Sequence, residues 1–266
     1  MIMKSILITG CNRGLGLGLV KCLVKEKNPP KSIIATCRDL NKAQARLGNN
    51  SGGTKIANLF QELQGIAESN NNVHILQLDV EDTETFDEFA RNVQEIVKDN
   101  GLNVLFNNAG YSPKSTRINM VKAQQMIDTF RINTVGPIML TKALLPALKK
   151  ASEVNCNHPL GSSRSAVINM STILGSISKN CEGGLYPYRC SKAALNIATK
   201  SLSIDLKKDG ILVTCVHPGW VKTDMGGSHA PIDVESSAKG LVTLMTSLSE
   251  KHNGEFYTWE GKALPW

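Results

Sequence analysis

A tyrosine and a lysine four residues apart form the clearest pair of side chains that could carry out acid–base chemistry. They occur in the stretch Tyr188-Arg189-Cys190-Ser191-Lys192, and this spacing puts both on one face of a helix. A free phenol has a pKa of about 10, too high for ready proton exchange at neutral pH. An ammonium about 5 Å away, at an effective dielectric of about 20, favours the phenolate by about 3 kcal/mol, or roughly two pKa units. We therefore predict that Lys192 lowers the pKa of Tyr188, which then exchanges a proton with a carbonyl oxygen.

Two hydroxyl side chains follow a predicted strand at 166–170 and could bind the same oxygen. Ser171 and Thr172 are adjacent, so alternation along an extended chain places them on opposite faces. Without a hydroxyl partner of this kind, Tyr188 is simply one residue of an amphipathic helix.

The beginning of the chain has the pattern of an anion-binding turn. An apolar run at 4–9 is followed by glycines at 10, 14 and 16 and then by apolar residues at helical spacing. The N-terminus of a helix offers unpaired N–H groups and partial positive charge to a pyrophosphate, and glycines allow the backbone to approach it closely. The spacing is GxxxGxG and no GK[ST] follows, which excludes a P-loop. A purely structural turn is the alternative.

The rest of the chain alternates between predicted strands and predicted helices. Strands are predicted at 4–9, 32–37, 73–78, 104–106, 166–170, 212–216 and 254–257. Helices are predicted at 17–24, 57–68, 83–97, 120–150 with a break at 135–137, 187–208 and 234–248, and a charged helical stretch from Leu40 is interrupted by a loop at 48–53. This order predicts one α/β domain over 1–266, a Rossmann-type doubly wound parallel sheet of about seven strands with helices on both faces.

Ligands of such sheets bind outside the carboxyl ends of the strands. The residues at those ends are polar or glycine: 10–16, Arg38, 79–80, 107–110, 171–172 and 218–219. If the ligand is a dinucleotide, Arg13 in the glycine turn and Arg38 after the second strand lie near its adenosine ribose. They favour NADPH over NADH, because guanidinium groups bind the 2′-phosphate that only NADPH carries. Asp39 could instead pair with an arginine.

Composition excludes several other classes of protein. The 266 residues are 41% hydrophobic and 20% charged, which is ordinary for a soluble globular protein. The net charge of +7 is dispersed and only 5% of residues are aromatic, so we expect no nucleic-acid partner. No run is apolar and long enough to span a membrane, and the N-terminus lacks a signal-peptide pattern. Seven cysteines without CxxC spacing predict reduced thiols in a cytoplasmic protein and no metal site.

Together these motifs resemble the short-chain dehydrogenase/reductase family. The resemblance rests on Thr9-Gly10-xxx-Gly14-x-Gly16, Asn107-Asn108-Ala109-Gly110, the hydroxyl at 171–172, Tyr188-xxx-Lys192 and Pro218-Gly219, in that order. Within the family, the runs 6–16 and 217–227 look like those of insect sniffer-type carbonyl reductases.

The resemblance implies a role for each matching residue. Tyr188 would be the general acid, Lys192 would lower its pKa and bind the nicotinamide ribose, and Asn133 would hold a water that links Lys192 to solvent. The family's catalytic serine falls in the register of Thr172, before Ile173-Leu174-Gly175, and Ser171 is the second candidate. Family members often dimerise through helices matching 120–150 and 187–208, so a homodimer is expected. The implied cofactor-binding residues are Gly10, Asn12, Arg13, Gly14, Leu15, Gly16, Arg38, Asp79, Val80, Asn107, Ala109, Gly110, Tyr188, Lys192, Pro218, Gly219, Val221 and Thr223.

The leading functional hypothesis is NADPH-dependent reduction of aldehydes, ketones or quinones to alcohols. An alcohol or hydroxysteroid dehydrogenase of the same family is the alternative, and Arg13 and Arg38 favour the reductase. A nucleotide-binding regulator without turnover is a third hypothesis, but it would not need Tyr188, Lys192 and Asn133. The loops at 111–119, 173–186 and 222–233 are expected to shape an apolar substrate pocket whose ligand they do not name.

Overall fold

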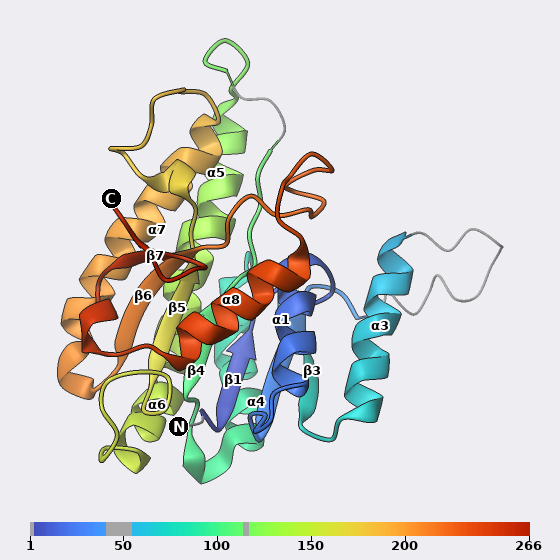
Figure 1. Ribbon diagram of the computed structural model, residues 1–266, viewed down its shortest axis with the longest axis vertical. Helices are drawn as coiled ribbons and strands as arrows, with labels where there is room; N and C mark the ends of the chain where they lie inside the picture. The colour runs from blue at the N-terminus through green and yellow to red at the C-terminus, as the bar shows by residue number, and fades with distance from the viewer. Residues whose placement is uncertain (1–2, 41–54, 114–116) are drawn as a thin grey trace.

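The computed structural model describes residues 3–40, 55–113 and 117–266, with the backbone alone for 55–60. Its centre is an eight-stranded sheet in the order β3-β2-β1-β4-β5-β6-β7-β8 (Figure 1). The strands up to β7 pair in parallel, and β8 returns antiparallel beside β7. Their bounds are β1 (Ser5–Ile8), β2 (Ser32–Cys37), β3 (Val73–Gln77), β4 (Val104–Asn107), β5 (Ala166–Met170), β6 (Leu212–His217), β7 (Phe256–Thr258) and β8 (Ala263–Leu264).

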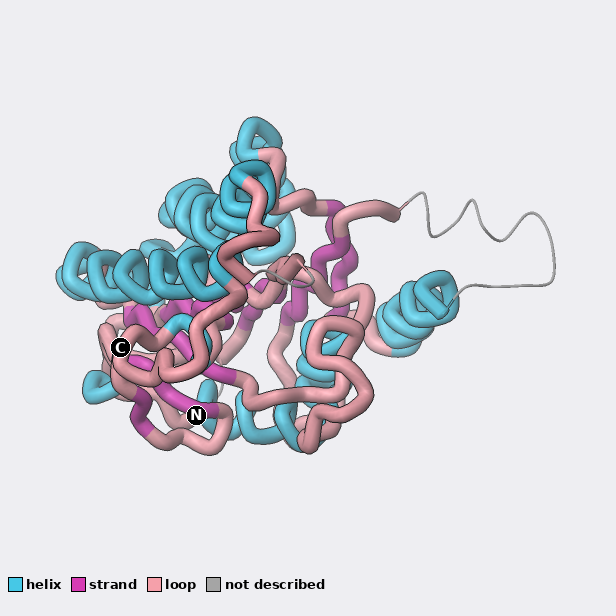
Figure 2. The backbone as a smooth tube through the Cα atoms, turned by 90° about the horizontal axis from the view of Figure 1, so that it is seen from above, coloured by secondary structure: helices cyan, strands magenta, loops and turns pink. Residues whose placement is uncertain are grey.

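Helices cover both faces of this sheet, as the view from above shows (Figure 2). The α-helices are α1 (Gly14–Val24), α3 (Lys55–Ser69), α4 (Phe86–Val97), α5 (Ala123–Phe130), α6 (Gly136–Val154), α7 (Tyr186–Asp205) and α8 (Val234–Thr246). The short helical turns are η2 (Thr83–Thr85), η3 (Lys98–Asn100), η4 (Arg131–Val135, a π-helical turn), η5 (Ile173–Gly175), η6 (Lys207–Asp209) and η7 (Glu250–His252). None of the helices in the described ranges is long and apolar enough to cross a membrane.

Two apolar cores lie on opposite faces of the sheet because side chains alternate along each strand. Ile6 and Ile8 of β1 face the core that includes α1 and α8, whereas Leu7 faces the core that includes α4 and α6. All three side chains are fully buried. A sheet buried on both faces explains why its strands read as continuous apolar runs in the sequence.

The predicted fold class is confirmed, with local differences. The sheet has an eighth strand, β8, which is too short at two residues to leave a pattern. The predicted helix at 120–150 is two helices joined by the π-helical turn η4, which overlaps the expected break at 135–137 at Val135. The helix predicted at 57–68 spans 55–69. The stretch from Leu40 and the loop at 48–53 lie almost entirely outside the described residues.

Candidate active site

Tyr188 and Lys192 lie one turn apart near the start of α7. Pro187 occupies the first turn of this helix, where a missing N–H costs no hydrogen bond. Lys192 is buried, and its Nζ donates a hydrogen bond of 2.7 Å to the carbonyl oxygen of Met170, the last residue of β5. The ammonium therefore sits at the carboxyl end of the central sheet, immediately before Ser171 and Thr172.

Burial decides the pKa values of both groups. It raises the pKa of Tyr188 to about 12, and it lowers the pKa of Lys192 to about 8 against the opposing effect of Cys215. The prediction that Lys192 lowers the pKa of Tyr188 is wrong for this structure, because removal of the phenol from water raises that pKa. Tyr188 is consequently protonated at neutral pH, which is the form a proton donor needs.

Asn133 lies in the π-helical turn η4 and holds the segment after β4 against α7. Its amide Nδ2 donates to the carbonyl oxygen of Tyr111 (2.8 Å) and to Ser191 Oγ (3.0 Å), while its Oδ1 accepts from Tyr111 N–H (2.8 Å). A Cβ atom on Gly110 would lie 3.3 Å from Asn133 Oδ1 and 3.6 Å from Lys192 Nζ. The structure thus brings Gly110, Asn133 and Lys192 close together from three distant parts of the sequence.

The two candidate hydroxyls have different partners. Ser171 Oγ donates to Asn196 Oδ1 at 2.5 Å, in the interior between β5 and α7. Thr172 Oγ1 accepts from the backbone N–H of Leu174 at 3.2 Å and keeps its own proton for another acceptor. This arrangement favours Thr172, the residue in the family register, as the hydroxyl available to a substrate.

The glycine turn between β1 and α1 is closely packed. A Cβ on Gly16 would lie 2.2 Å from the carbonyl oxygen of Gly10, and Gly10 itself has a φ of +72°. The first turn of α1 has no acidic residue, and its N-terminus has no side-chain cap. The glycine turn therefore fits an anionic diphosphate, which the N–H groups at the start of α1 can bind.

Thr9 and Asn108 fix this turn, although neither has a predicted role in cofactor binding or catalysis. Asn108 Nδ2 donates to the carbonyl oxygens of Thr9 (2.8 Å) and Gly10 (3.3 Å). Thr9 Oγ1 accepts from the N–H groups of Asn108 and Ala109, both at 2.9 Å. Both residues belong to the motifs that carry the family resemblance, but the contact between them depends on two strands that prove to be neighbours.

The two arginines expected near a 2′-phosphate are both exposed. Arg13 Nη1 forms an ion pair of 3.0 Å with Asp224 Oδ2, and both side chains are about half exposed. Arg13 would have to leave Asp224, or share its charge, to reach a phosphate. A Cβ on Gly14 would lie 3.5 Å from Thr223 Cγ2, so the segment 221–227 borders the glycine turn.

The other predicted cofactor residues also lie at the carboxyl ends of strands. Val80 follows β3 and packs tightly on α6, since a Cβ on Gly136 would lie 2.6 Å from its carbonyl oxygen. Asn107 points into the interior instead, where its Nδ2 donates to Asn169 Oδ1 at 2.8 Å. Pro218 accepts a hydrogen bond from Ser237 Oγ at the start of α8. At this edge of the sheet also lie Asn12, Leu15, Asp79, Ala109, Gly219 and Val221.

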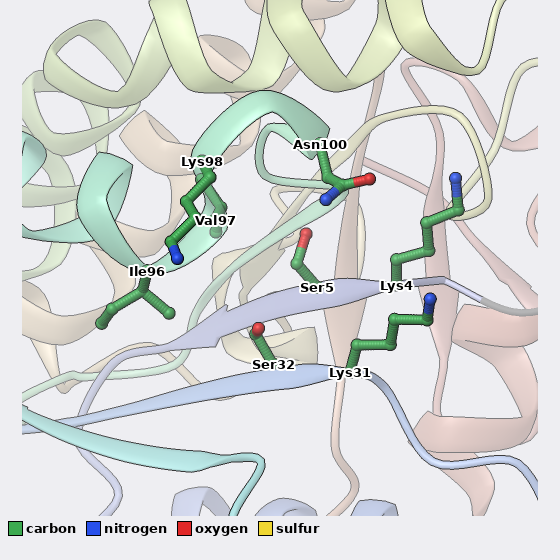
Figure 3. Close-up of a pocket in the computed structure, with 8 residues that line it drawn as sticks. All are labelled: Lys4, Ser5, Lys31, Ser32, Ile96, Val97, Lys98 and Asn100. Carbon is green, nitrogen blue, oxygen red and sulfur yellow. The ribbon is translucent and has the colours of Figure 1, made fainter.

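A hollow at the opposite edge of the sheet is separate from this site (Figure 3). It lies at the amino ends of β1 and β2, and its lysines extend in different directions. Lys98 extends toward Ile96, whereas Lys4 and Lys31 extend away from Ile96. Their ammonium groups do not converge on one point. Within the described ranges, no group of three or more His, Cys, Asp or Glu residues could hold a metal ion.

Comparison with known families agrees with this geometry. The profile of the short chain dehydrogenase family matches residues 4–231. The chain belongs to this family, and it is an oxidoreductase of the short-chain dehydrogenase/reductase type.

Within the family, the chain is similar in structure to carbonyl reductases. It is 49% identical to the carbonyl reductase Sniffer of D. melanogaster, with 100% of both chains covered and a TM-score of 0.92. It is 38% identical to an NADPH-bound carbonyl reductase from chicken fatty liver, again with 100% of both chains covered, at a TM-score of 0.88. An uncharacterised oxidoreductase of Schizosaccharomyces pombe is 29% identical over 280 residues, covering 97% of this chain and 96% of that protein.

Proposed function

We propose that this protein reduces aldehydes, ketones or quinones to alcohols with NADPH. The observation that carries the proposal is the position of the Lys192 ammonium, which reaches the end of β5 beside Thr172, one helical turn from Tyr188. These three side chains would supply a proton donor, a charge and a hydroxyl at this edge of the sheet. The similarity to an NADPH-bound carbonyl reductase supports the choice of cofactor.

The residues that would hold NADPH are those of the glycine turn and of the neighbouring strand ends. The N–H groups at the start of α1 would bind its diphosphate, Arg13 and Arg38 its 2′-phosphate, and Lys192 its nicotinamide ribose. When bound, NADPH supplies the hydride that the carbonyl carbon accepts. The segments around Asp79, Asn107–Gly110 and Pro218–Thr223 would line the remainder of the site.

The side chains would act on the carbonyl oxygen. Thr172 Oγ1 donates a hydrogen bond that holds the oxygen in place, and Tyr188 donates its proton as negative charge develops there. The raised pKa keeps Tyr188 in the protonated form that a donor needs at neutral pH, although it also makes the phenol a weaker acid. Asn133 would hold the water from which Lys192 and then Tyr188 are reprotonated.

The test is NADPH consumption by the purified protein with a panel of aldehydes, ketones, quinones and hydroxysteroids. Tyr188→Phe should reduce kcat by about 10²- to 10⁴-fold, the usual contribution of a general acid. Tyr257→Phe is the matched control, because its hydroxyl binds the Lys251 carbonyl oxygen away from the site. Full turnover by Tyr188→Phe would refute the mechanism, and faster oxidation of alcohols with NADP⁺ would favour the dehydrogenase alternative.

We also propose that the protein is a cytoplasmic homodimer. All seven cysteines are free thiols, which suits a reducing compartment. Ile127 and Phe130 on α5 and Ile197 and Ile204 on α7 are exposed, and a second copy would bury these apolar side chains. Sedimentation of Ile197→Glu should then report a monomer, while a monomeric unaltered protein would refute the dimer.

A further inference from the structure

The segment that follows Thr172 is held on one side by α7. This segment, residues 173–178, begins with the turn η5. A Cβ on Gly175 would lie 2.9 Å from Lys192 Cβ, so the backbone of the segment touches the helix at the lysine itself. Asn196 Nδ2 also donates to the carbonyl oxygen of Gly175 at 3.2 Å. The position of the segment is thereby coupled to that of Lys192.

The other side of the segment is held by residues far along the chain. Ser176, almost fully buried, donates through Oγ to the carbonyl oxygen of Pro265 at 2.8 Å. Ser178 donates twice to the carbonyl oxygen of Trp266, through its N–H at 3.2 Å and through its Oγ at 2.9 Å. Three hydrogen bonds thus join the segment to Pro265 and Trp266.

Trp266 is itself anchored to the sheet. Its ring stacks on that of Phe256, with centroids 5.7 Å apart and planes inclined by 19°. Phe256 is fully buried in β7 and is paired with Cys215 of β6. Because β6 leads directly into Pro218, Trp266 connects the segment after Thr172 to the strand that carries the proposed nicotinamide end of the site.

We propose that Trp266 is a positioning residue that fixes the segment 173–178 and so determines which carbonyl substrates fit beside Thr172. This rests on the proposed function. Leu174 N–H binds Thr172 Oγ1, so a shift of the segment also shifts the hydroxyl. Ile173 and Leu174 are only partly buried next to it, and they form the wall that a bulky substituent would meet. A small aldehyde needs little of this wall, whereas a bicyclic ketone or quinone needs it in place.

The test compares Trp266→Ala with Trp266→Phe, which keeps a ring that can stack on Phe256. For Trp266→Ala we expect KM to rise about tenfold for a bicyclic quinone and less than about twofold for a small aliphatic aldehyde, with kcat nearly unchanged. A tenfold rise in KM is the size expected when about three hydrogen bonds to the segment weaken. Amide hydrogen exchange over 173–181 should accelerate in the same variant. Trp266→Phe should restore both readouts.

A second variant avoids any loss of folding caused by a missing indole. Ser176→Ala combined with Ser178→Ala removes the side-chain donors, and it should reproduce the selective rise in KM. Ser69→Ala, an exposed serine at the end of α3, is the control and should change neither KM nor exchange.

The possible outcomes separate this assignment from the proposed function. Equal losses on small and bulky substrates, or unchanged exchange over 173–181, would overturn the positioning role of Trp266. Normal carbonyl reduction with an unchanged substrate preference in Trp266→Ala would overturn that role alone. Failure of the unaltered protein to reduce any carbonyl would overturn the proposed function, and the exchange measurement would still decide whether Trp266 holds the segment.

Discussion

Replacing Lys192 with Met should stabilise the protein at neutral pH while removing its activity. Burial lowers the pKa of Lys192 from 10.5 to about 8, which corresponds to about 3 kcal/mol of folding free energy at about 1.4 kcal/mol per unit. Met cannot donate to the Met170 carbonyl oxygen, and the lost hydrogen bond costs about 1 kcal/mol. We therefore expect Lys192→Met to be about 2 kcal/mol more stable at pH 7.

The sign of this difference must change with pH. Between about pH 8 and 10.5 the unfolded chain keeps the Lys192 proton and the folded chain loses it, so the unaltered protein gains stability as pH rises. The advantage of Lys192→Met should shrink across this window and become a deficit of about 1 kcal/mol above it.

Urea unfolding of both proteins at several pH values, without cofactor, measures this difference. Cofactor is omitted because a bound ligand would stabilise the folded state by itself. Lys142→Met, at an exposed position of α6, is the control and should show no such trend. A stability difference for Lys192→Met that is the same at pH 7 and pH 10 would refute the reasoning.

Three further predictions concern the hydroxyl, the glycine turn and the arginine. Thr172→Ala should lower kcat for carbonyl reduction about 10²-fold, and Ser171→Ala should lower it less; the reverse order would show that Ser171 is the reactive hydroxyl. Gly16→Ala should weaken NADPH binding at least about tenfold in a fluorescence titration, because its Cβ would lie 2.2 Å from a carbonyl oxygen of the turn. An unchanged Kd would contradict the role of the glycine turn in binding the diphosphate. Asp224→Asn should release Arg13 and tighten NADPH binding by up to about fivefold, the range of an exposed ion pair, with little effect on NADH; an equal gain for both cofactors would refute competition for Arg13.

Much of the site could be predicted from the sequence because its spacing is periodic. The four-residue separation of Tyr188 and Lys192 determines that they share a helix face, and alternation along an extended chain separates Ser171 from Thr172. The carboxyl ends of parallel strands necessarily meet at one edge of the sheet. These inferences need only local geometry and the fold class.

The rest depends on contacts that no local pattern encodes. The predicted pKa of Tyr188 was wrong in direction because a pairwise charge estimate omits burial, which became known only with the packing around α7. Asn108 binds the glycine turn because β1 and β4 are neighbours in the sheet, and Asn196 binds Ser171 because α7 crosses β5. Strand β8 has too few residues for alternation to be recognised.

The π-helical turn that holds Asn133 limits how this region can change in evolution. Such a turn contains one residue more than a regular helix needs for the same rise. Deleting a single residue between Arg131 and Val135 would allow one continuous α-helix, but it would remove the wide turn that presents Asn133 to Tyr111 and Ser191. We therefore expect this turn to tolerate substitutions at its exposed positions but no change in length.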